Sequence, residues 1–422
     1  MNPDRTRQPA IHVPDGVALP SVRKVGTPCG IPLHVLTTPG FEVARVSLVF
    51  RAGVRFQNRP FQASAALNLM SEGTARYSSA EISGMIDFYG AYLDLNLDRD
   101  YAVITLSCLS KFLPTMLPLV EEVVCRPAFL SEELAVYTAK RKQQLRLERE
   151  KPSFRAREMF SEALYGQDHP YGCYFPEEEY DRLTPEALRA FHHQYYVAEN
   201  CFAVASGELS DNDLSGIVHL LDAVPQGVQA GFPEIPPHPD FAPIRTTRPG
   251  SLQSAIRIGK LMFPRSHPDF TGMQVVTTLL GGYFGSRLVS NLREDKGYTY
   301  GVFSTMVNFE SAGHLAVSTE VAAEHTDDAI AEIFREMVRL RDEPVGGDEL
   351  DMVKNIITGE MMRILDGPFG IADVTIENIQ NGTDNGYLDR FLAEVKTITP
   401  ERVQALSRRY LSSDSFVQVI VG

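Results

Sequence analysis

Long apolar runs are absent from this sequence, and this absence bears on the cellular compartment of the protein. No apolar run approaches the roughly 18 residues that a membrane-spanning helix requires. The polar start at residues 1–5 also lacks the apolar core of a signal peptide. We therefore expect a cytoplasmic protein, or a periplasmic one if an export signal has been removed.

Paired cysteines and concentrated basic segments are missing as well. The five cysteines are widely spaced, odd in number and form no C-x-x-C, which argues against a disulfide framework and against a cysteine-rich zinc site. A net charge of -14 opposes binding to nucleic acid or to anionic membranes, since either would need a concentrated basic face. The short basic runs at 140–142 and 408–409 fit solvated helix faces better than binding patches. We expect neither nucleic acid nor a membrane as a partner.

What the sequence does contain is an internal repeat. Residues 183–207 align without a gap on residues 398–422, so that Thr184 matches Thr399 and Gly207 matches Gly422 at a constant separation of 215 residues. Copies of this size are too large for the units of a solenoid. The repeat therefore predicts a tandem duplication of a whole domain, and a length of 422 residues has room for two such domains.

Seven prolines lie between the two copies, in residues 225–249. Proline removes backbone donors and favours extended chain, so this range is expected to be a semi-rigid linker. The predicted organisation is an N-terminal domain at 1–224, a linker at 225–249 and a C-terminal domain at 250–422.

Each copy combines alternating apolar segments with helical periodicity, which predicts α+β domains with one sheet backed by helices. Two hairpins are expected, one over residues 31–53 with its turn at Pro39-Gly40 and one over residues 93–107. The expected helices lie at 60–71, from Ser78 onward with a serine and glutamate cap, and at 111–125, 131–150 and 153–165.

The segment from Leu288 to Phe303 is the candidate for a functional site. Arg293 would close a helix, a Lys-Gly pair would stop that helix, and Tyr300 would open a strand. Both side chains could then point into one space. The alternative is a surface arginine and a core tyrosine at an ordinary helix end.

This segment resembles the arginine and tyrosine segment in the C-terminal half of the pitrilysin-like (M16) zinc peptidases, which include the mitochondrial processing peptidase. The match is at Arg293, Glu294, Gly297 and Tyr300. The resemblance implies two M16-type α/β-sandwich domains in tandem, forming a half-shell. It also implies that Arg293 and Tyr300 reach a substrate beside a zinc ion held by an N-terminal half.

The zinc-binding residues of the family are missing. The family's H-x-x-E-H, anchored on Gly73-Thr74, falls on residues 64–68, where Ser64 and Asn68 replace the histidines and Leu67 replaces the glutamate. The third ligand aligns on Gln144. Zinc prefers thiolate, imidazole and carboxylate ligands, so this chain is expected to hold no metal and no other cofactor.

The resemblance therefore implies the non-zinc subunit of a heterodimeric peptidase. A zinc-bearing M16 paralogue would be its partner, a peptide its substrate, and Arg293 and Tyr300 its catalytic residues. An alternative is a catalytically inert scaffold or peptide-binding subunit, like the M16-type core proteins of a respiratory complex. A homodimer that binds peptides without cleaving them is a third reading.

Overall fold

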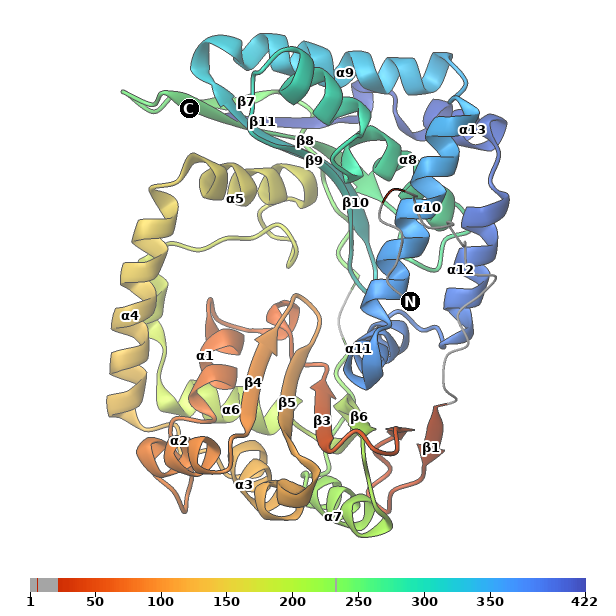
Figure 1. Ribbon diagram of the computed structural model, residues 1–422. Helices are drawn as coiled ribbons and strands as arrows, with labels where there is room; N and C mark the ends of the chain where they lie inside the picture. Colours follow the sequence, from red (N-terminus) through yellow and green to blue (C-terminus); the bar gives the residue numbers. More distant parts are fainter. Residues whose placement is uncertain (1–5, 7–21, 232–233) are drawn as a thin grey trace.

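The computed structural model describes residues 6, 22–231 and 234–422, and it has two lobes (Figure 1). Each lobe contains one sheet with helices packed on it, one of six strands and one of five. The predicted α+β fold with two domains in tandem is confirmed. The expectation for the polar start rests on residues 1–5, and that for the linker rests in part on Pro233. These residues lie outside the described part of the chain.

The N-terminal sheet has the strand order β1-β2-β6-β3-β5-β4. All its neighbours are antiparallel except β2 and β6, which run parallel. Its strands are β1 (Arg23–Val25), β2 (Leu33–Thr37), β3 (Val43–Phe50), β4 (Tyr92–Leu97), β5 (Ala102–Leu109) and β6 (Cys201–Gly207).

The hairpin expected over residues 31–53 is wrong. Its two strands exist as β2 and β3, but β6 lies between them, and Ala203 of β6 is opposite both Leu33 and Leu48. Every residue of β6 is buried, so this apolar strand takes a central position and separates the other two. Alternation identifies a strand without identifying its neighbour. The second expected hairpin, β4 with β5, is confirmed by the pairing of Leu95 with Ile104.

The C-terminal sheet has the order β7-β11-β8-β10-β9, which leaves β9 at an edge. The expected linker, 225–249, contains the short strand β7, which pairs parallel with β11, so part of that range belongs to the sheet. The strands are β7 (Ile244–Thr246), β8 (Gln253–Met262), β9 (Val302–Asn308), β10 (Gly313–Ala322) and β11 (Val417–Val421).

The helices repeat the duplication seen in the sequence. Both α5 and α11 span fourteen residues. Helix α5 begins at Pro152, whereas α11 begins at Gly367, with Pro368 as its second residue. In the first copy the helices are α1 (Gln62–Leu69), α2 (Ser79–Phe88), α3 (Leu113–Cys125), α4 (Ser131–Arg149), α5 (Pro152–Tyr165), α6 (Pro185–Tyr195) and α7 (Asp211–Asp222). In the second they are α8 (Phe270–Thr277), α9 (Thr326–Asp342), α10 (Gly347–Ile364), α11 (Gly367–Gln380), α12 (Gly386–Thr397) and α13 (Pro400–Tyr410).

Each copy packs one helix on the other copy's sheet. Helix α5 lies against β8 and β11 of the C-terminal sheet, and α11 lies against β6 and β2 of the N-terminal sheet (Figure 1). Phe160 of α5 sits so close to Gly259 of β8 that a Cβ there would come within 2.5 Å of the phenylalanine ring. On the other side, Ile376 of α11 packs with Leu36 and Val204. The exchange ties the lobes together and fixes α5 between them.

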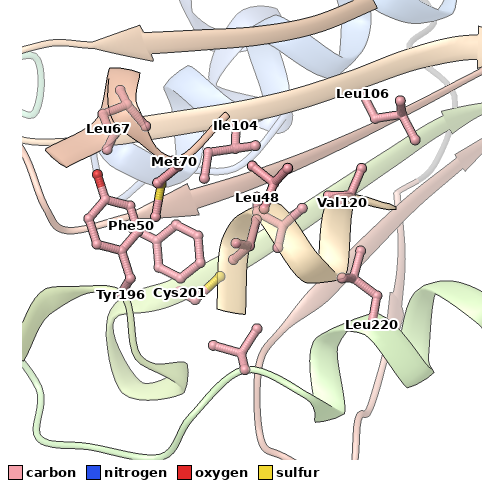
Figure 2. Packing of buried hydrophobic residues seen from close by; sticks show 14 of the residues in the cluster. Leu48, Phe50, Leu67, Met70, Ile104, Leu106, Val120, Tyr196, Cys201 and Leu220 are labelled. Atoms are coloured by element: carbon pink, nitrogen blue, oxygen red, sulfur yellow. The ribbon is translucent and has the colours of Figure 1, made fainter. Parts of the chain in front are cut away.

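Ordinary apolar burial stabilises the N-terminal lobe. Figure 2 shows Leu48 and Phe50 of β3, Leu67 of α1, Ile104 of β5 and Tyr196 packed in one cluster. All five are at most 1% exposed, so each contributes on the order of 2 kcal/mol of burial free energy. Among the described residues, no helix is both long and apolar enough to cross a membrane.

A buried ion network also joins the lobes. Asp100, in the β4–β5 turn, accepts hydrogen bonds from Arg55 at 2.8 Å and from the Tyr171 hydroxyl at 2.6 Å. Glu310, between β9 and β10 of the other lobe, donates its backbone N–H to Asp100 and forms ion pairs with Arg51 and Arg55. The carboxylate of Asp100 thus neutralises a guanidinium that is only 8% exposed.

Candidate functional site

The backbone around Tyr300 is held by the end of a helix and by a threonine. A π-helical segment, η6 (Val289–Asp295), is followed after Lys296 by Gly297 at φ +65°, a left-handed conformation that favours glycine. The N–H of Tyr298 donates to the carbonyl of Leu292, which closes the wide turn. Thr299 then donates through its hydroxyl to the carbonyl of Glu320 at 2.7 Å. The predicted helix stop at Lys296-Gly297 is confirmed, and β9 begins two residues after Tyr300.

Tyr300 itself projects into solvent. Its side chain is 93% exposed and lines a cavity of about 400 Å³ together with Phe303, Arg257 and Glu320. Phe303, Ser318 and Arg257 are directly opposite one another on β9, β10 and β8, so these three side chains share the face of the sheet on which α5 packs. This placement is not that of a core tyrosine. The hydroxyl is free to reach a ligand on this face.

Arg293 occupies the neighbouring helix end. Its guanidinium lies over the ring of Phe284, 4.6 Å from the centroid, and its Nε is 3.4 Å from a carboxylate oxygen of Glu294. The side chain is 38% exposed, and the residues that line the Tyr300 cavity do not include it. Both side chains are accessible, and their joint action on one substrate stays a prediction.

Two of the three positions aligned with the zinc ligands lie close together. Ser64 of α1 and Gln144 of α4 line the same cavity, of about 330 Å³. Asn68 is exposed on the next turn of α1, and its amide donates to the carbonyl of Ser64 at 2.8 Å. Leu67, at the position of the family's catalytic glutamate, is fully buried in the apolar core (Figure 2). The Ser64 hydroxyl donates to the carbonyl of Phe61 at 2.9 Å.

These residues do not fit a zinc ion. Serine, asparagine and glutamine offer neutral oxygens, which are poor replacements for imidazole and carboxylate. A cation also stands beside them, because the guanidinium of Arg141 donates to the Gln144 side-chain oxygen at 3.0 Å. In the part of the chain that the structure describes, no group of three or more His, Cys, Asp or Glu side chains is placed to hold a metal.

We expect the purified chain to contain no stoichiometric zinc after mild dialysis, because its donor set is neutral and adjoins Arg141. Elemental analysis measures the metal content directly. A Ser64→His, Leu67→Glu, Asn68→His and Gln144→Glu variant, which rebuilds the family's ligand set, is the positive control. One zinc per wild-type chain that is lost in a Gln144→Ala variant would contradict the expectation.

Comparison with known proteins matches this architecture. The family description "Insulinase (Peptidase family M16)" matches residues 35–171, and "Peptidase M16 inactive domain" matches residues 182–357. The "Uncharacterized zinc protease YmxG" of Bacillus subtilis is 22% identical over 84% of this chain and 86% of its own length. A shorter stretch, 32% of this chain and 31% of the relative, is 22% identical to the "Probable inactive metalloprotease YmfF" of the same species.

Solved structures share the whole fold. A peptidase M16 inactive domain from Pseudomonas fluorescens superposes with a TM-score of 0.87 at 24% identity, covering 95% of this chain and 98% of that one. A protease from Helicobacter pylori gives a TM-score of 0.85 at 15% identity, covering 96% and 100%. With the two family descriptions covering most of the chain, this protein belongs to peptidase family M16.

Proposed function

We propose that this chain is the non-zinc subunit of a heterodimeric M16-type peptidase and supplies Arg293 and Tyr300 to an active site formed with a zinc-bearing paralogue. One observation carries the proposal. Tyr300 presents its hydroxyl with 93% of the side chain exposed, in a chain whose own ligand positions hold Ser64, Asn68 and Gln144. An exposed tyrosine on a fixed turn has little structural value, whereas it can donate to a substrate.

The sheet beside Tyr300 is suited to an extended peptide. Strand β9 is the edge of its sheet, and an edge strand carries backbone donors and acceptors that a peptide can pair with. Phe303 of β9 is 66% exposed and offers apolar contact on the same face. A peptide held along this edge would pass next to the Tyr300 hydroxyl.

The partner's zinc would supply Lewis acidity and an activated water to the reaction. This chain's residues would act on the peptide. The Tyr300 hydroxyl would donate a hydrogen bond to the substrate carbonyl as it gains negative charge, and Arg293 would add a positive charge near the same group. Arg293 is preorganised by the ring of Phe284, which limits its rotamers.

The alternative is an inert scaffold or peptide-binding subunit, in which Arg293 and Tyr300 only end a helix and begin a strand. A scaffold role would leave the exposure of Tyr300 without a purpose. The two proposals differ in a measurable way, because a scaffold can assemble with a partner but does not need the tyrosine hydroxyl for turnover.

The proposal is tested first by assembly. We expect co-expression with an M16 paralogue that has an intact H-x-x-E-H to give a complex of about twice the 46.9 kDa of this chain on size exclusion. The complex should cleave peptides that neither subunit cleaves alone. Strictly monomeric elution with every such paralogue from the same genome would contradict a heterodimer.

A further inference from the structure

The cavity beside Ser64 and Gln144 is lined by arginines rather than by metal ligands. Four arginines face it against two glutamates: Arg99, Arg141, Arg149, Arg157, Glu148 and Glu158. Glu158 is already paired with Arg149 at 2.8 Å and with Arg155 at 3.0 Å. The remaining carboxylate, Glu148, accepts a long hydrogen bond from the Gln144 amide at 3.4 Å.

Three of these arginines have no carboxylate within ion-pair distance among the described residues. Arg99 donates to the carbonyl of Pro170 at 3.3 Å, Arg141 donates to Gln144, and Arg157 lies over the ring of Phe154 at 4.7 Å. The Nε of Arg141 is buried and has no hydrogen-bond partner there. In a chain with 54 acidic residues against 40 basic ones, three guanidinium groups without an ion-pair partner among the described residues line one cavity.

The positive charge of Arg157 adds to the effect of burial on two other arginines. Burial lowers the pKa of Arg99 and of Arg257, and the positive charge of Arg157 acts on both in the same direction. Arg157 therefore lies within electrostatic reach of Arg99 in one cavity and of Arg257 in the Tyr300 cavity. An anion bound among them would relieve this repulsion.

Helix α5 connects the two cavities. Ser153 lines the Tyr300 cavity, and Phe154, Arg157 and Ser161 line the arginine cavity. Ser153 and Arg157 are one helical turn apart, so about 6 Å separates them along the helix. An extended peptide covers that distance in about two residues. A peptide that passes Tyr300 can thus place a nearby group among the arginines.

We propose that this cavity, which Ser64 and Gln144 also line, binds a carboxylate of the peptide through Arg99, Arg141 and Arg157. The planar guanidinium forks match the geometry of a carboxylate, and the walls leave room for a side chain. The carboxylate is an aspartate or glutamate side chain or the peptide C-terminus. The inference rests on the proposed function only in taking a peptide as the ligand.

The test uses the purified full chain without any partner. The probes are short peptides, acetylated and amidated at their ends, with two central glutamates or with two glutamines in their place, and calorimetry measures their affinities. We expect the glutamate peptide to bind at least about tenfold more tightly, because charge-assisted hydrogen bonds to arginine are strong. The glutamine peptide with a free C-terminus tests the terminal carboxylate as the ligand. If this peptide binds more tightly than its amidated form, the cavity binds the terminal carboxylate.

Variants assign the preference to the cavity. Arg157→Gln, at an exposed position on α5, is expected to reduce the preference for the glutamate peptide over the glutamine peptide about threefold or more. Arg157→Lys is expected to retain part of this preference. Arg390→Gln is the matched control, since Arg390 of α12 is 66% exposed, pairs with Asp384 and does not line the cavity. Equal affinity for the acidic peptides and for the neutral amidated one would overturn the proposal. So would a preference that survives both Arg157→Gln and Arg99→Gln. Because no zinc-bearing partner is present, these results are separate from the success or failure of the heterodimer proposal.

Discussion

Replacement of Tyr300 by phenylalanine is expected to lower the kcat of the assembled peptidase about tenfold to a thousandfold. The change removes one hydroxyl from a side chain that is 93% exposed, so it disturbs almost no packing. A donor aimed at developing negative charge acts mainly in the transition state, so KM should change less than kcat. Steady-state kinetics of the reconstituted complex measures both constants.

Tyr298→Phe is the matched control for this prediction. Tyr298 lies two residues earlier in the same turn, its ring is stacked on His325 at 4.3 Å, and it is absent from the Tyr300 cavity. Its hydroxyl should be dispensable for turnover. Arg293→Ala should also lower kcat, and the double variant should be less than additive if both groups act on one oxygen. If the complex with Tyr300→Phe and the complex with Tyr298→Phe both have the wild-type kcat, a catalytic role for the Tyr300 hydroxyl is excluded.

Replacement of Asp100 by alanine is expected to lower the free energy of unfolding by about 3 kcal/mol. The change removes the carboxylate nearest to Arg55, which is only 8% exposed. It also removes the acceptor of the Glu310 N–H and of the 2.6 Å hydrogen bond from the Tyr171 hydroxyl. Losing one partner of a buried ion pair costs far more than losing a surface pair. Urea unfolding followed by circular dichroism measures the change.

Asp384→Ala provides the comparison. Asp384 also pairs with an arginine, but at 3.5 Å and with both side chains well exposed. Its loss should change stability by less than about 1 kcal/mol. Equal effects of the two substitutions would show that the network around Asp100 does not hold the lobes together.

Local structure could be predicted well because its causes are local. The serine cap of α2 and the glutamate at its third position form the expected capping box, with Ser78 accepting from the Glu81 N–H. The helix expected at 131–150 is α4, Ser131–Arg149. The helix stop at Gly297 needed only a residue that accepts positive φ.

Long-range arrangement could not be predicted in the same way. Alternation in residues 31–53 indicates two strands, but their separation by β6 depends on a segment more than 150 residues away. The exchange of α5 and α11 between the lobes could not be predicted from the sequence either, since an amphipathic helix does not specify which sheet it covers. Residue range 1–224 therefore contains a helix that packs on the sheet of range 250–422.

The candidate site shows the same division. Arg293 and Tyr300 are close in sequence and could be proposed from a short segment. The arginine cavity combines Arg99 from the β4–β5 turn, Arg141 from α4 and Arg157 from α5. No local motif connects these three positions, and the net charge of -14 gives no indication of a basic cavity. Only the fold brings them together.

The central claim is that this chain completes the active site of its partner. Its most direct test is the turnover of a complex that carries both Tyr300→Phe and Arg293→Ala, compared with the wild-type complex at matched stoichiometry by size exclusion. We predict a complex that assembles normally and has lost most of its turnover. A double variant that cleaves peptide at the wild-type rate would contradict the account and make this chain a scaffold.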